Sequence, residues 1–147
     1  MSEDNVPEDL VKEPDYVYAQ LIKDSALEHL AAVANIGASF SVSVIVDGQI
    51  IYGDLISGKA YCEKMYKNFV SSSGDEGVNE AIGSFFKQLG ENVYTKEKNS
   101  DIPTNYLHLD NYAIMRSDGG VVDVQGALLR VAIDRVSAFS LGRPGKK

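Results

Sequence analysis

The chain has 147 residues, of which 44% are hydrophobic, and its formal net charge is −7. This length and composition predict a single domain with a core of its own, and they exclude a largely disordered chain. The acidic balance of 21 acidic against 14 basic residues disfavours a dedicated nucleic-acid-binding protein, because such proteins usually carry a surplus of Lys and Arg.

The first 13 residues hold five acidic residues and one lysine. With Pro7 and Pro14 as breakers, we expect residues 1–13 to form a disordered acidic arm. The segment lacks the apolar stretch of a signal peptide, and we find no run of roughly 20 apolar residues that could span a membrane. Cys62 is the only cysteine, which fits a reducing compartment. We therefore expect a cytoplasmic protein.

Residues 15–35 have the pattern of a helix. Ile22, Ala26, Leu30 and Val33 recur at helical spacing and predict one apolar face. Gly37 follows where a helix commonly ends in a left-handed glycine. The sequence thus predicts an N-terminal helix.

A β-hairpin is predicted next. Phe40, Val42, Val44 and Val46 would point one way, with Ser41 and Ser43 between them, and residues 50–56 form a second apolar run. Asp47-Gly48 between them favours a two-residue turn, because both central residues of a type I′ turn need a positive φ. This turn would pair Val46 with Gln49, and Gly53 in the second strand indicates a bend or a bulge.

Two helices and a polar segment follow the hairpin. Ser57 is placed to cap a helix over 58–70. A second helix is predicted over 76–89, with Val78, Ile82, Phe85 and Leu89 on one face and Gly90 at its end. Residues 91–105 are polar and without periodicity, so we expect a long exposed loop.

The last third returns to strand patterns. We expect strands over 106–116, over 121–133 with an interruption at Gly126, and over 136–141. The fold class is therefore α+β, a strongly bent antiparallel five-stranded sheet or a small Sm-like barrel, with a two-helix insertion between its second and third strands. We expect one domain over 14–142 and a basic tail over 143–147.

Candidate catalytic groups are few. His108 and Asp110 are two residues apart on a predicted strand and therefore share a face, as an acid–base pair would require. Cys62 has Lys59 nearby, but we interpret it as an inert helix cysteine. The histidines, the cysteine and the dispersed aspartates match no zinc or calcium pattern. We assign no catalytic, cofactor-binding or metal-binding residue.

The residues that resemble a known family lie in three segments: 37–69, 108–111 and 129–142. None of these segments contains a catalytic motif. In the first, the shared positions are Phe40, Ser43, Val46, Gly48, Ile51, Gly53, Ile56, Ser57, Lys59, Tyr61 and Phe69. In the third, they are Leu129, Arg130, Ile133, Val136, Phe139, Leu141 and Gly142. In this combination and order, the chain resembles the gas-vesicle accessory protein U family. Val131 departs from the family pattern, which has a small glycine after the arginine.

The resemblance implies a non-catalytic accessory protein of gas vesicles, the air-filled protein shells that give some microbes buoyancy. Such a protein would act by protein–protein interaction in vesicle assembly, growth or organisation, with shell or accessory proteins as partners. No cofactor comes with the family. We expect association with vesicles in the cytoplasm, and neither nucleic acid nor membrane as a partner.

An open sheet edge in the late strands would let the chain form a homo-oligomer. The candidate interface residues are Leu129, Val131, Ile133, Phe139, Tyr106 and Tyr112. We expect a proline at Val131 to abolish the oligomer without unfolding the monomer. Two other functions stay open: an Sm-like RNA-binding module, which the net charge disfavours, and a small enzyme that uses the His108/Asp110 pair.

Overall fold

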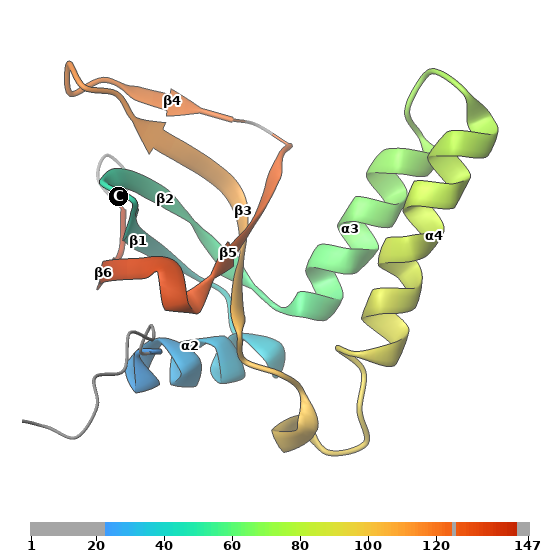
Figure 1. Ribbon diagram of the computed structural model, residues 1–147, viewed down its shortest axis with the longest axis horizontal. Coiled ribbons are helices and arrows are strands. Elements are labelled where there is room, and N and C mark those ends of the chain that lie inside the picture. Colours follow the sequence, from blue (N-terminus) through green and yellow to red (C-terminus); the bar gives the residue numbers. More distant parts are fainter. Residues whose placement is uncertain (1–22, 125, 144–147) are drawn as a thin grey trace, which may run out of the picture.

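The structure is a computed structural model that describes residues 23–124 and 126–143. It is an α+β fold in which one helix lies against an antiparallel sheet and a helical hairpin projects from the sheet's side (Figure 1). The acidic arm predicted for 1–13, and the tail beyond residue 143, lie outside the described residues. None of the described helices is both long enough and apolar enough to cross a membrane.

The α-helices of this part of the chain are α2 (Ser25–Asn35), α3 (Gly58–Val70) and α4 (Glu76–Asn92). The first three strands are β1 (Phe40–Val46), β2 (Gln49–Ile56) and β3 (Tyr106–Met115). The last three are β4 (Val121–Asp123), β5 (Leu128–Ala132) and β6 (Val136–Leu141).

Helix α2 differs from its prediction in its buried face. It begins after Asp24, whose side chain accepts a hydrogen bond from the amide of Ala26 (2.8 Å), while residues 15–22 lie outside the described residues. Its buried side chains are Leu27, Ala31 and Ala34, and Ala26 of the predicted face is exposed. The prediction was wrong because the helix SALEHLAAVAN carries apolar residues on more than one side, so periodicity alone could not select the face.

The β1–β2 hairpin confirms its prediction. Val46 pairs with Gln49 and Val42 pairs with Gly53. Asp47 has a φ of 50° and Gly48 a φ of 80°, as the two-residue turn requires. The predicted bulge also occurs: Tyr52 pairs with Ala113 but Asp54 pairs with Asp110, so β3 has one extra residue opposite Gly53.

The sheet has six strands within the described residues, not the five predicted. The predicted strand over 121–133 divides near Gly126 into β4 and β5, and both pair with β3. The strand order is β4-β3-β2-β1-β6, with β5 beside β3. A single 3-10 turn, Ile133–Arg135, carries the chain from β5 to β6.

Because β5 and β6 belong to opposite sides of the strand order, this short turn requires the sheet to bend strongly on itself (Figure 1). The sheet does not close, since no pairing joins β5 to β6 among the described strands. The Sm-like barrel is therefore not confirmed. The main core lies between the sheet and α2 and contains Leu27, Val44, Leu55, Leu109 and Ile133.

Helices α3 and α4 form an antiparallel hairpin, which we call the arm. The Ser57 side chain accepts a hydrogen bond from the amide of Ala60 (3.0 Å) and begins α3 at the predicted residue. Helix α4 does not end at Gly90 but continues to Asn92. Gly90 is buried against α3, where a Cβ atom would lie 2.9 Å from the Cβ of Cys62, so this glycine serves close packing.

The segment 91–105 is mostly exposed, as its polarity predicts, but it is not free of structure. Its first two residues belong to α4, and Asn99–Asp101 form a 3-10 turn. Tyr94 and Ile102 are buried with Tyr61 and Cys62 in a second core cluster between the arm and the sheet. Two apolar side chains in an otherwise polar stretch are thus sufficient to anchor the segment.

Candidate functional site

The junction between the arm and the sheet is built around His108 of β3. The His108 side chain is buried, and its Nε2 atom has no hydrogen-bond partner. Its ring centroid lies 4.6 Å from that of Tyr61 and 5.2 Å from that of Tyr94. Burial, with a smaller effect from the Arg130 guanidinium, lowers the pKa of His108 to about 3. The imidazole is therefore neutral at physiological pH and packs as an aromatic side chain.

Arg130 and Tyr106 complete this junction at the surface. The Arg130 guanidinium lies 3.9 Å from the ring centroid of Tyr106 and 5.9 Å from that of Tyr94, close enough for cation–π attraction. Sequence reasoning did not bring Arg130 and Tyr94 together in one site. Their sequence neighbours carry no signal for it, because β3, β5 and the 91–105 segment meet only in the fold.

The His108/Asp110 pair is not assembled for acid–base chemistry. The Asp110 carboxylate lies 3.5 Å from the Lys64 ammonium and accepts a hydrogen bond from the Asn111 amide (2.9 Å). The His108 Nε2 atom has no partner. The two side chains are therefore not joined in the way that an oriented imidazole requires.

The other candidate groups also lack the surroundings of reactive centres. Burial raises the pKa of Cys62 to about 11, and a thiol that stays protonated is a poor nucleophile. A groove beside Cys62 is lined by charged side chains of both signs, among them Lys59, Glu63 and Lys87. No group of three potential metal-ligating side chains occurs within residues 23–124 and 126–143.

Strands β5 and β6 form the two open edges near the C-terminus of the fold. Among the described strands, β5 pairs only with β3 and β6 pairs only with β1. The other side of each strand therefore presents unpaired main-chain groups, which can accept an added strand.

The alternation of hydrogen bonds along an antiparallel pair shows which main-chain groups of β5 are unpaired. The Ile133 amide donates to the Asn105 carbonyl (2.9 Å), so every second residue of β5 points its amide at β3, and the residues between point outward. Val131 thus donates within the sheet, and a proline there would remove a sheet hydrogen bond. Because Arg130 and Ala132 carry the outward amides, a proline at Val131 would disturb the sheet as well as the edge, so it is not a selective test of the oligomer.

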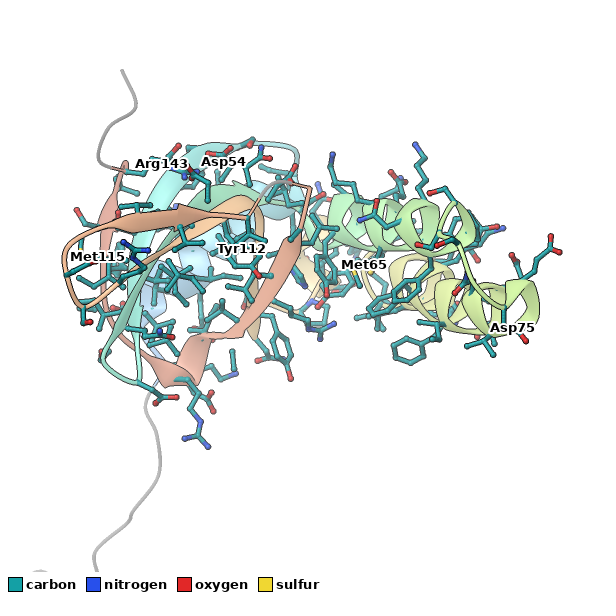
Figure 2. All side chains as sticks on the ribbon, turned by 90° about the horizontal axis from the view of Figure 1, so that it is seen from above. Asp54, Met65, Asp75, Tyr112, Met115 and Arg143 are labelled. Carbon is teal, nitrogen blue, oxygen red and sulfur yellow. The ribbon has the colours of Figure 1, made fainter. Side chains whose placement is uncertain are left out.

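The six candidate interface residues occupy different environments. Val131 and Ile133 are buried in the main core, and Leu129, Phe139 and Tyr112 pack against it. Tyr106 is exposed. Figure 2 shows Tyr112 within the sheet region, far from the arm's tip at Asp75. Any contribution of the buried members to an interface must therefore come through the main chain of their strands.

Taken together, the described residues form a curved antiparallel sheet with open edges and a projecting arm. Residues 24–144 match the family model described as gas vesicle protein GvpU-like. The chain belongs to this GvpU-like family, as the resemblance predicted, and membership implies a gas-vesicle-associated protein. Neither the curated proteins nor the solved structures gave a match.

Proposed function

We propose that this chain is a non-catalytic accessory protein of gas vesicles that binds other proteins during vesicle assembly, growth or organisation, and so serves buoyancy. Family membership over residues 24–144 supports the association with vesicles. Its place is the cytoplasm, on or near the vesicle. Its partners are vesicle shell or accessory proteins and further copies of itself, and not nucleic acid or membrane.

The proposed mode of binding rests on β5 and β6, each of which has one side without a paired strand. In β5 the outward main-chain groups belong to Leu128, Arg130 and Ala132, from the alternation set by Ile133 and Asn105. In β6 the same reasoning from the Gly142 amide, which donates to the Ser41 carbonyl (2.7 Å), leaves Phe139 and Leu141 facing outward. Tyr106 and Arg130 border the β5 edge and supply side-chain contacts.

Ala132→Pro tests this edge without disturbing the sheet. Ala132 has a φ of −69°, which suits proline, and only an outward amide is lost. We expect the wild type to form a defined oligomer by light scattering in dilute solution, where weak contacts are dissociated, and Ala132→Pro to be a monomer under the same condition with an unchanged circular dichroism spectrum. A monomeric wild type, or a variant of unchanged mass, would contradict an edge-mediated oligomer.

Binding to vesicles is tested separately by flotation. Purified chain is mixed with isolated gas vesicles, which rise on centrifugation, and the protein in the floating layer is quantified. The proposal predicts saturable recovery with the vesicles. Recovery equal to that of an unrelated acidic protein of similar size would refute the proposed function.

A further inference from the structure

The arm has an apolar surface that no described residue covers. The exposed fractions of Val78, Ile82 and Phe85 on α4 are 54%, 38% and 60%, and that of Val70 at the end of α3 is 41%. Figures 1 and 2 show the arm standing clear of the sheet, with Asp75 at its far end. We call the surface formed by Val78, Ile82 and Phe85 the arm face; Val70 lies on the other side of the arm, beside Glu76 and Glu80.

The arm face is exposed because α4 packs on α3 through other residues. A Cβ atom at Gly83 would lie 3.3 Å from the Tyr66 ring, and one at Gly90 would lie 2.9 Å from the Cβ of Cys62. Phe86, between these glycines, stacks on Phe69 with 6.1 Å between the ring centroids. The glycine side of α4 therefore makes the close contact, and the larger side chains of Ile82 and Phe85 are turned aside.

The arm face carries no charge. At 3.6 residues per turn, the residues of α4 beside Ile82 and Phe85 on the solvent side are Gly77, Ala81 and Gln88. Glu80 and Lys87 lie about half a turn away, and Lys87 lines the charged groove on the arm's other side. The arm thus has one charged side and one uncharged, apolar side.

We propose that the arm face binds the arm face of a second copy of this chain, with the two α4 helices antiparallel. Val78, Ile82, Phe85 and Leu89 are spaced four, three and four residues apart, which is the spacing of a helix–helix seam. A two-fold axis between Gly83 and Ser84 sets Ile82 against Phe85 of the second copy and Val78 against Leu89. Ile82 and Phe85 of the two copies then meet at the centre, and Val78 meets the part of Leu89 that the cluster between the arm and the sheet leaves uncovered.

The size of the surface indicates a weak, reversible dimer. A fully covered aromatic side chain buries roughly 150–250 Å², and Phe85, Val78 and Ile82 are 60%, 54% and 38% exposed. The arm face with its small flanking residues therefore offers less than the lower limit of about 1,000 Å² in total for a stable specific interface. We therefore expect an association that depends on protein concentration.

Phe85→Asp tests the arm face, with Lys67→Gln as the matched control. Both substitutions change the net charge by one negative unit, but Lys67 lies on the charged side of the arm. The comparison is made in the Ala132→Pro background, so that the sheet edge does not contribute. By sedimentation equilibrium we expect a dimer that Phe85→Asp weakens about tenfold or more and that Lys67→Gln changes less than about twofold.

A cross-link provides a second test that does not depend on disrupting the arm. Ile82→Cys brings two thiols close to the proposed two-fold axis, whereas Ser72→Cys places the thiol in the loop at the arm's tip. We expect mild oxidation to link Ile82→Cys into a dimer and to leave Ser72→Cys and the wild type, whose Cys62 is buried, monomeric in reducing-agent-free gels.

The outcomes separate this inference from the proposed function. Equal self-association of Phe85→Asp and the control, or equal cross-linking at positions 82 and 72, overturns the arm dimer and leaves the vesicle proposal unaffected. Loss of vesicle flotation in Phe85→Asp without any arm dimer also overturns it, because the occupant is then a vesicle protein and not a second copy.

Discussion

His108 links the arm to the sheet in a way that depends on its protonation state. Its pKa is lowered to about 3, chiefly by burial and secondly by Arg130, whereas an unfolded histidine titrates near 6.5. Between these values the unfolded chain binds a proton that the folded chain does not. The contribution of His108 to stability is therefore complete above pH 6.5 and decreases as the pH falls towards 3.

We expect the free energy of unfolding to fall with acidification below pH 6.5 by up to about 1.4 kcal/mol per pH unit from this histidine alone. Urea unfolding at several pH values measures the slope. His108→Leu should remove this part of the slope, whereas His29→Gln, at an exposed position of α2, should retain it. Equal slopes in wild type and His108→Leu would show that the buried imidazole does not control the acid response.

At the scale of elements, the position of the arm relative to the sheet depends on Gly58, the first residue of α3. A Cβ atom at Gly58 would overlap the Tyr94 ring, and the Gly58 amide donates to the Asn35 side chain at the end of α2 (3.0 Å). Gly58 therefore allows α2, α3 and the 91–105 segment to meet at one point.

Gly58→Ala should lower the free energy of unfolding by about 1–3 kcal/mol, because the Tyr94 ring must move in a packed cluster. Gly77→Ala, in the first turn of α4, is the matched control: its Cβ atom would meet only the Asp75 side chain, at 3.3 Å. The control should be neutral or stabilising by up to about 1 kcal/mol. Two variants of equal stability in urea would contradict the packing described at Gly58.

Local sequence patterns predict the helices, strands and turns of this fold better than the contacts between them. Asp47-Gly48 encodes a turn through its own backbone requirements, and Ser57 encodes the start of α3, so both could be read directly. Tyr94 and Ile102 could not, because they are buried only after the arm and β3 come together.

The same reason accounts for the other differences. The buried face of α2 is chosen by the sheet it packs on, and Gly90 lies within α4 because of its contact with Cys62. For the candidate interface, the sequence indicated late edge strands, but the direction of the Val131 amide follows from the β3–β5 register. Tertiary pairing, and not local propensity, decides these features.

At the scale of the whole molecule, the two surfaces that we propose for protein contacts are separate. The open edges of β5 and β6 lie on the sheet, and the arm face lies on the projecting hairpin (Figure 1). A chain that binds through two surfaces can connect several partners, and weak contacts at each surface multiply when both are engaged. This is the property that a protein organising a repetitive shell would need.

Hydrogen–deuterium exchange in the presence of gas vesicles tests the use of the sheet edge most directly. The outward amides of Arg130, Ala132, Phe139 and Leu141 have no partner within the sheet, so they should exchange rapidly in chain diluted until it is monomeric and become protected when vesicles are added. The β1–β2 hairpin, already paired on both sides, should show no further protection. Unchanged exchange across β5 and β6 in the chain recovered with vesicles would contradict binding through this edge.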